Sequence, residues 1–166
     1  MSKFIILGSN SFAGASFVNS CIDKDNDVIG INRSPEVSGI FLPVRKNNKK
    51  KNYKFLNLDL NKDMEIILEH IDNFKPDFII DFAGQGMVAE SWQQPYQWYQ
   101  TNIVSKAKLH RFLIGKPYLK RYIRISTPEV YGSNENLIKE SNSMNPSTPY
   151  AISHMATDLS IFALHR

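Results

Sequence analysis

The chain of 166 residues has very little cysteine: Cys21 is the only one. A single cysteine excludes an internal disulfide framework and suits a reducing compartment, so we expect a cytoplasmic protein. No apolar stretch approaches the length that crosses a bilayer, and we expect no membrane partner. The segment before the first apolar run, Met1–Lys3, is too short for a secretory signal. Cys21 falls on the apolar face of the first expected helix, which predicts a buried, structural thiol.

The chain also has fewer acidic than basic residues: it contains 16 Asp and Glu and 20 Lys and Arg, which gives a formal net charge of +4. Much of the excess lies in residues 45–54. Such a run is either a surface for nucleic acid or other phosphates, or a solvated loop before a strand. We favour the loop and expect no nucleic-acid partner, because only Tyr53 interleaves an aromatic ring and no RNA- or DNA-binding motif accompanies the run. We predict no metal site.

Apolar runs and helical periodicities alternate along the chain. They predict strands over residues 3–8, 28–31, 53–59, 77–82 and 122–125. They predict helices over 12–22, 61–73 and 88–114, the last interrupted near Pro95, and a final helix from 149 onward. Residues 34–52 are expected to form a loop with at most one helical turn. We expect Asn61 to cap its helix. The expected core face of the last helix is Ile152, Met155, Ala156, Leu159 and Ala163.

The expected strands are continuous apolar runs, which is typical of strands buried on both faces. Their alternation with helices predicts an α/β fold with short, right-handed crossovers. We therefore expect a Rossmann-type doubly wound parallel sheet, in the order 3-2-1-4-5, with helices on both faces.

A glycine-containing turn, Gly-Ser-Asn-Ser-Phe-Ala-Gly at residues 8–14, follows the first strand and opens the first helix. In this context a helix N-terminus binds a pyrophosphate through its free N–H groups. We predict a dinucleotide site here; the alternative is a purely structural turn. The residues expected at the ligand are Gly8, Ser11, Phe12 and Gly14.

The second expected strand ends in Asn32 and Arg33 rather than in an acid. Folds that prefer NAD usually place Asp or Glu here to hold the ribose 2′-hydroxyl. Arg33 with Ser34 could instead bind a 2′-phosphate. The sequence therefore favours NADP over NAD, unless Arg33 is only a surface residue.

The most informative pattern is Ile-Ser-Thr-Pro-Glu-Val-Tyr-Gly at residues 125–132, followed by Pro-Tyr-Ala-Ile-Ser-His at 149–154. Thr127 follows a strand, and Tyr150 and His154 share one helix face. These residues resemble the extended short-chain dehydrogenase/reductase family, specifically its nucleotide-sugar epimerases and dehydratases, with His154 where the family has lysine. The resemblance implies oxidation at C4 of a nucleotide-diphosphate sugar by NADP or NAD, then elimination or epimerisation through a 4-keto intermediate, in a homodimer.

The resemblance also implies roles. Tyr150 would be the acid/base at the sugar hydroxyl, Thr127 would bond the same oxygen, and His154 would replace the lysine that binds the ribose. Histidine is the weaker cation, because its ordinary pKa near 6.5 leaves it mostly neutral at pH 7. Glu129 matches the glutamate of 4,6-dehydratases and decarboxylases, whereas Pro128 stands where dehydratases often have a proton-donating aspartate. Each residue also has a structural alternative. Tyr150 could be a core tyrosine at a helix start, His154 a hydrogen-bonded or solvent-facing histidine, and Glu129 an exposed carboxylate in a turn.

Further cofactor contacts follow from the same resemblance. Besides Tyr150 and His154 they are Asp59, Leu60, Phe82, Ala83, Gly84 and Asn102. Asp59 would contact the adenine, although it could instead cap the next helix. Asn102 would help to order the site, although it could have only a structural hydrogen bond.

Members of this family are about twice as long as this chain, and their second half grips the sugar. We therefore expect residues 1–166 to be the NAD(P)-binding domain without the C-terminal sugar-binding part, as a piece of a longer protein or a natural short form. Such a chain should bind cofactor without turnover. The alternative function is a catalytically inactive NAD(P)-binding or scaffold protein of the same fold, which His154 and Pro128 would favour.

Overall fold

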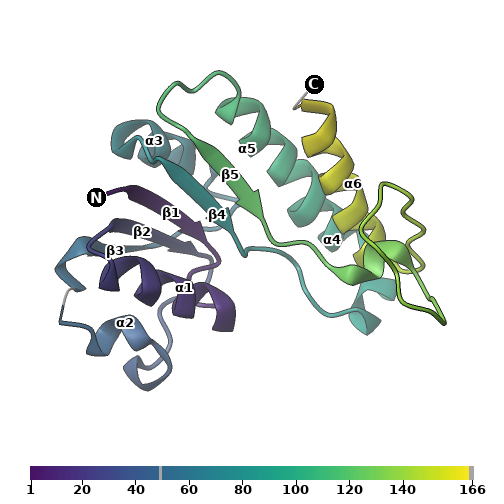
Figure 1. Ribbon diagram of the computed structural model, residues 1–166, viewed down its shortest axis with the longest axis horizontal. Helices are drawn as coiled ribbons and strands as arrows, with labels where there is room; N and C mark the ends of the chain where they lie inside the picture. Colours follow the sequence, from purple (N-terminus) through teal and green to yellow (C-terminus); the bar gives the residue numbers. More distant parts are fainter. Residues whose placement is uncertain (49, 165–166) are drawn as a thin grey trace. The chain divides into compact units, whose positions relative to one another are not determined.

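The structure is a computed structural model that describes residues 1–48 and 50–164 (Figure 1). Two compact units form, and each is considered by itself. The first consists of Met1–Ala83 and Gly115–Ile125, and the second of the remaining described residues. The predicted basic run at residue 49 and the predicted last helix at 165–166 lie outside the described residues.

The first unit contains a parallel sheet of five strands. The strands are β1 (Lys3–Leu7), β2 (Asp27–Asn32), β3 (Tyr53–Asn57), β4 (Phe78–Asp81) and β5 (Arg121–Arg124). Their order is β3-β2-β1-β4-β5, which confirms the predicted sheet. Because all strands are parallel, the residues that follow them meet at one edge, the carboxyl edge of the sheet.

Helices cover both faces of this sheet. The first unit contains α1 (Phe12–Asp23), α2 (Pro43–Lys46), α3 (Met64–Phe74) and the 3₁₀ turns η1 (Gly39–Phe41) and η2 (Lys50–Asn52). The connection through α1 runs from β1 to β2, whereas that through α3 runs from β3 to β4, across β1. Right-handed crossovers in opposite directions place α1 and α3 on opposite faces, as predicted. The predicted loop over 34–52 contains three short helical pieces rather than at most one.

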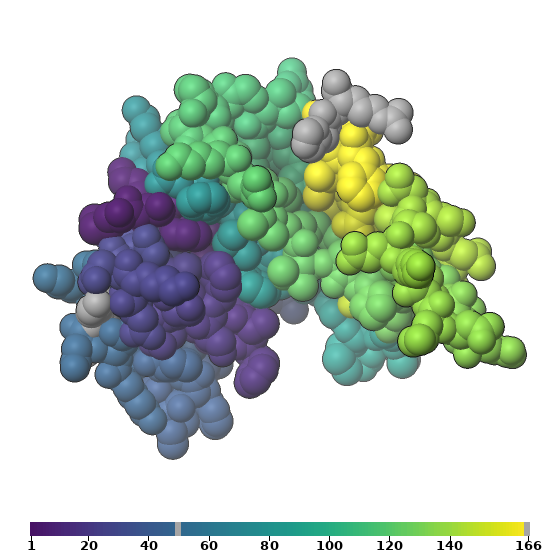
Figure 2. All heavy atoms as spheres, in the orientation of Figure 1, coloured from purple at the N-terminus to yellow at the C-terminus, as the bar shows by residue number. Residues whose placement is uncertain are grey.

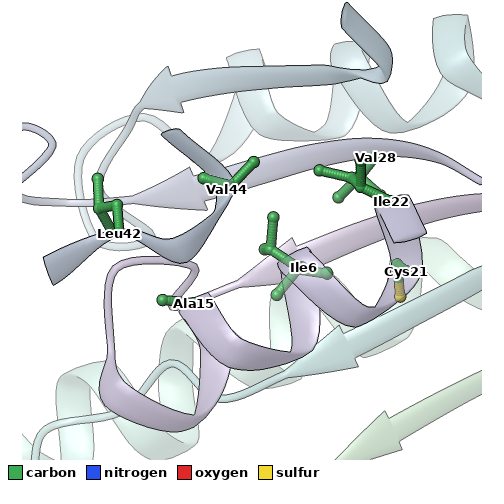
Figure 3. Close-up of a cluster of buried hydrophobic side chains, with 8 residues drawn as sticks. Ile6, Ala15, Cys21, Ile22, Val28, Leu42 and Val44 are labelled. Atoms are coloured by element: carbon green, nitrogen blue, oxygen red, sulfur yellow. The ribbon is translucent and has the colours of Figure 1, made fainter. Parts of the chain in front are cut away.

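A cluster of buried side chains joins α1 and α2 to the sheet (Figure 3). Its members are Ile6, Ala15, Val18, Cys21, Ile22, Val28, Leu42 and Val44. Ile5 and Leu7 alternate with Ile6 along β1 and so face the opposite side, where they are also buried. Cys21 is buried as predicted, and burial raises the pKa of its thiol to about 11.

The start of α3 differs from the prediction that Asn61 caps it. The N-cap residue is Asp63, and its carboxylate accepts from the Asp59 N–H at 2.8 Å. The Asp59 carboxylate accepts from the Asn61 N–H at 2.7 Å. Neither Asn61 nor Asp59 caps the helix, because the two aspartates form a hydrogen-bonded turn that delays its start to Met64.

The second unit is mostly helical. It contains η3 (Ala89–Trp92), α4 (Pro95–Tyr99), the π-helical segment η4 (Gln100–Ser105), α5 (Lys106–Leu113), η5 (Pro128–Tyr131) and α6 (Pro149–Leu164). Pro95 begins α4, which confirms the predicted interruption. Residues 133–143 are exposed throughout and form the yellow-green surface in Figure 2. Among residues 1–48 and 50–164, no helix has the length and apolar character needed to cross a membrane.

The predicted core face of α6 is wrong. Ile152 and Leu159 are exposed, whereas the buried face consists of Pro149, Ala151, Ser153, His154 and Thr157. The buried face packs against η4 through hydrogen bonds of polar side chains, described below. Hydrophobic periodicity therefore predicted the helix correctly but assigned the wrong face of it to the core.

Candidate functional site

The turn after β1 is tightly constrained by its two glycines. Gly8 has φ +77°, and a Cβ there would lie 2.7 Å from the Ala83 nitrogen and 2.8 Å from the Phe82 carbonyl carbon. A Cβ on Gly14 would lie 2.3 Å from the Gly8 oxygen. The structure thus brings Gly8 and Gly14 together with Phe82 and Ala83, the two predicted residues that follow β4.

Ser11 is the N-cap residue of α1. Its hydroxyl accepts from the Gly14 N–H at 3.0 Å and thereby satisfies one donor of the first turn. The Phe12 and Ala13 N–H groups have no acceptor among the described residues, and both residues are exposed. Two free donors therefore remain at the positive end of a 12-residue helix, as an anion site requires.

The loop after β2 lies against this turn. The Asn10 side-chain amide donates to the carbonyls of Ser34 and Pro35, at 3.2 and 3.0 Å. Asn32 is half-buried and donates to the Ser34 carbonyl at 3.3 Å, while Arg33 is exposed. The predicted ribose-side residues thus lie at the same carboxyl edge as the glycine turn.

Asp81, at the end of β4, orients the next predicted segment. It is fully buried, and its carboxylate accepts from the Ala83 N–H at 3.0 Å and from the Tyr122 hydroxyl. Asp59 and Leu60 follow β3; Leu60 is buried and Asp59 half-buried in the turn described above. The rival role of Asp59 as a helix cap is thereby excluded, and its contact with adenine stays a prediction.

In the second unit a buried network is centred on Asn102, within η4. Its Oδ1 accepts from the Gln85 N–H at 2.8 Å, and its Nδ2 donates to the Gln85 carbonyl at 3.2 Å and to Ser153 Oγ at 2.9 Å. A Cβ on Gly84 would lie 3.2 Å from Asn102 Oδ1. The network joins the Gly84–Gln85 segment to α6, so Asn102 has structural hydrogen bonds, and its role in ordering a cofactor site stays a prediction.

Tyr150 and His154 lie together on the first turns of α6. Their ring centroids are 4.6 Å apart with an interplanar angle of 47°. His154 is buried, which excludes the solvent-facing alternative, while Tyr150 is half-buried. The Tyr150 N–H donates at 3.2 Å to the hydroxyl of Ser91, which is fully buried and itself donates to the Val88 carbonyl at 2.6 Å.

Glu129 belongs to η5, which packs against α6, and Thr127 directly precedes η5. Thr127 is the N-cap residue, and its Oγ1 accepts from the Glu129 N–H at 3.3 Å. Its O–H hydrogen remains to donate elsewhere. Glu129 is half-buried, not fully exposed. Ser126 donates to the Asp158 carboxylate on α6, which fastens the start of this segment to the helix that carries Tyr150.

Asn10, Ser91 and Ser153 make clear contacts in this geometry, although none of them was among the predicted site residues. Asn10 was visible as a polar residue inside the glycine turn, and Ser91 lies in a segment, residues 88–95, that resembles the family's Val-x-x-Ser-x-x-x-Pro. The contacts of Ser91 and Ser153 were not predictable, because their partners are far away in the sequence. No group of three His, Cys, Asp or Glu side chains within residues 1–48 and 50–164 could hold a metal ion.

A five-stranded parallel sheet in this order, with a glycine turn and an open helix start at its carboxyl edge, defines a Rossmann-type α/β domain. The sequence pattern described as GDP-mannose 4,6 dehydratase matches residues 5–166. The chain therefore belongs to this family, which confirms the resemblance to nucleotide-sugar epimerases and dehydratases.

Individual relatives agree with this assignment. An uncharacterised protein of Schizosaccharomyces pombe is 32% identical, with 95% of this chain and 47% of that protein covered. UDP-glucose 4-epimerase of Mycoplasma pneumoniae is 28% identical, with 99% and 48% covered. The structure of dTDP-glucose 4,6-dehydratase from Streptomyces venezuelae with NAD bound superposes with a TM-score of 0.84 at 24% identity, with 99% and 52% covered. The chain spans about half the length of the curated relatives it matches.

Proposed function

We propose that this chain is the NAD(P)-binding part of a nucleotide-sugar epimerase or dehydratase. The observation that carries the proposal is the open start of α1, where Phe12 and Ala13 are exposed and their N–H groups have no acceptor within residues 1–48 and 50–164. The glycine turn holds this helix end against the residues after β4 without any side chain in between. A pyrophosphate fits such a cradle, because it accepts hydrogen bonds and is attracted by the helix dipole.

The residues around the cradle suit a dinucleotide rather than an isolated phosphate. Asn32, Arg33 and Asp59 follow neighbouring strands, where the adenosine half would lie at the carboxyl edge. The Streptomyces venezuelae relative binds NAD. A bound NAD(P) would supply the acceptor for a hydride from C4 of the sugar.

Tyr150, Thr127 and His154 are proposed to manage the proton of the same reaction. The Tyr150 phenol would accept the proton of the sugar 4-hydroxyl, and the free O–H of Thr127 would donate to the same oxygen. The His154 ring lies tilted against the Tyr150 ring and, when protonated, would stabilise the phenolate and donate to the ribose. Oxidation at C4 requires the loss of a hydride and of a proton. The cofactor would accept the hydride, and these side chains would accept the proton.

Glu129 supports chemistry beyond simple oxidation. Its carboxylate lies on η5, next to the α6 helix that carries Tyr150, and could act as a base on a 4-keto intermediate. Pro128 begins η5 and cannot donate a proton to a leaving hydroxyl. Of the acid and base that dehydration requires, this chain therefore supplies the base.

A catalytically inactive NAD(P)-binding or scaffold protein is the second candidate. It is favoured by His154, which is buried beside Tyr150 in the family's lysine position. An imidazole is a weaker base than the lysine amine and would support phenolate formation less. This candidate shares the cofactor site and differs only in turnover.

The remaining features of the whole protein are part of the same proposal. Because the matched relatives are about twice as long, we propose that a nucleotide-diphosphate sugar is bound with the help of residues beyond this chain. We propose a cytoplasmic homodimer that pairs through the exposed apolar side of α6, where Leu159 and Phe162 are 44% and 47% exposed. No residue of this side is used in the buried network of Asn102.

The experiment is a calorimetric titration of the 166-residue chain with NAD+ and with NADP+. We expect a micromolar dissociation constant for at least one of them. If neither binds at millimolar concentration, the glycine turn is only structural and the proposal fails. If a cofactor binds, turnover is sought with the chain joined to the C-terminal half of a matched relative, and binding without turnover would favour the scaffold candidate.

A further inference from the structure

One side chain, Asn10, ties the loop after β2 to the glycine turn. Its Nδ2 donates to the Ser34 carbonyl at 3.2 Å and to the Pro35 carbonyl at 3.0 Å. The Asn32 amide donates to the same Ser34 carbonyl at 3.3 Å. The backbone of the loop that carries Arg33 is therefore fixed before any ligand arrives.

This arrangement decides which charges the loop presents. Carbonyl oxygens repel a phosphate, but the Ser34 and Pro35 carbonyls point at the Asn10 amide and are occupied by it. The side chains of Arg33 and Ser34 are exposed. The loop thus exposes the hydroxyl of Ser34 and the positive charge of Arg33, while its Ser34 and Pro35 carbonyls face Asn10.

The charge of the loop itself has the same sign. Residues 32–41, which begin the connection after β2, contain one base, Arg33, and one acid, Glu36. Glu36 forms an ion pair with Arg45, so its charge is compensated. The Arg33 guanidinium attracts a doubly charged phosphate more strongly than a neutral hydroxyl.

We propose that Asn10 is a specificity-determining residue, which makes the loop after β2 select the 2′-phosphate of NADP over the 2′-hydroxyl of NAD. This inference rests on the proposed cofactor site. Without the Asn10 amide, the Pro35 carbonyl loses its side-chain donor and the Ser34 carbonyl keeps only that of Asn32. The Pro35 carbonyl can then turn toward the ligand, and the advantage of the phosphate falls. Affinity for the pyrophosphate, which depends on α1, stays the same.

The structure also separates this role from a contribution to stability. Asn10 Oδ1 is buried and has no donor among the described residues. Asn10→Ala therefore removes two hydrogen bonds together with one unsatisfied acceptor, and these changes oppose one another. We expect the melting temperature to change by less than about 4 °C.

The test measures the dissociation constants of NAD+ and NADP+ by calorimetry for the wild-type chain, Asn10→Ala and Asn57→Ala. Asn57 is the matched control, because its amide also donates to a backbone carbonyl at the end of β2, that of Asn32 at 3.0 Å, without contacting Ser34 or Pro35. We expect a preference for NADP+ of at least about tenfold in the wild type and Asn57→Ala. In Asn10→Ala it should fall to about threefold or less, with NAD+ affinity unchanged.

Each other outcome overturns the inference in a recognisable way. If Asn10→Ala keeps the wild-type preference, or if the wild type prefers NAD+, Asn10 does not select the 2′-phosphate while the cofactor site stands. If Asn10→Ala weakens NAD+ and NADP+ equally, the residue only maintains the turn. If the wild type binds neither, the proposed function fails as well.

Discussion

Ser11 stabilises the start of α1. Its hydroxyl caps α1 through the Gly14 N–H. Ser11→Ala should lower the free energy of unfolding by about 1 kcal/mol and Ser11→Gly by only a few tenths. Urea denaturation checks this, with Ser16→Ala as control: Ser16 Oγ bonds back to the Phe12 carbonyl within α1, and its loss should be nearly neutral. Equal effects of Ser11→Ala and Ser16→Ala would contradict the capping role.

His154 is the residue whose chemistry departs most from the family. Lysine at this position would be protonated at pH 7.5, whereas an ordinary imidazole is mostly neutral. A charge-assisted hydrogen bond to the ribose should make His154→Lys bind NAD(P)+ about tenfold more tightly at that pH. Calorimetry measures this, and His70→Lys on α3 controls for the added charge. The idea fails if the two variants gain affinity equally.

Among single residues, sequence could predict those whose role is local. The glycines of the first turn and the pair Tyr150 and His154 follow from spacing along one strand end or one helix face. Ser91 could not be predicted, because its partner, the Tyr150 N–H, lies 59 residues away. Nothing in the residues around Ser91 indicates where its hydroxyl points.

At the scale of elements, the start of α6 depends on this serine. Ser91 Oγ accepts from the Tyr150 N–H, one of the N–H groups that a helix start leaves without an internal partner. Ser91→Ala leaves that donor unsatisfied and should cost about 1–3 kcal/mol in the free energy of unfolding. Denaturant titration tests this, with the exposed Ser143→Ala as control. A loss no larger than that of Ser143→Ala would show that the hydroxyl does not fix α6.

The connection from α3 to the segment before β5 predicts a pH dependence. Lys116 Nζ donates to Asp72 at 2.7 Å and the Tyr118 hydroxyl donates at 2.7 Å; these bonds lower the pKa of Asp72 below its ordinary 3.8. Because the folded pKa is the lower one, this contribution is complete above about pH 4 and is lost as the pH falls through the folded value.

Asp72→Asn should therefore reduce the acid sensitivity of the unfolding free energy below about pH 4. Denaturation curves at several pH values compare it with the wild type and with Glu69→Gln, which removes an exposed acid from the same helix. The interpretation is wrong if Asp72→Asn and the wild type lose stability in parallel below pH 4.

The elements themselves were largely predictable, and the exceptions have a physical cause. The sheet was predicted from continuous apolar runs, and the three central strands β1, β2 and β4 are indeed buried, whereas the edge strands β3 and β5 are partly exposed. The buried face of α6 was missed because Ser153 and Thr157 are buried by hydrogen bonds, which hydrophobic periodicity does not register. The π-helical segment around Asn102 likewise has no signature in the apolar pattern.

At the scale of the whole molecule, the apolar side of α6 that periodicity assigned to the core is exposed. Exposed apolar residues that follow a helical spacing are typical of an interaction surface. We predict a dimer by light scattering for the wild type and a monomer for Leu159→Glu, while Ile66→Glu, on α3 with similar exposure of 47%, stays dimeric. A monomeric wild type would refute pairing through α6 in this chain.

The central claim is that the open start of α1 binds the pyrophosphate of a nicotinamide dinucleotide. The most direct measurement is an NMR titration of the ¹⁵N-labelled chain with NADP+ and NAD+, followed at the backbone amides. We predict that the Phe12 and Ala13 amides, for which the described part of the chain provides no acceptor, show the largest downfield shifts. Unchanged Phe12 and Ala13 amides at saturating cofactor, or the largest shifts among residues 45–54, would contradict the account.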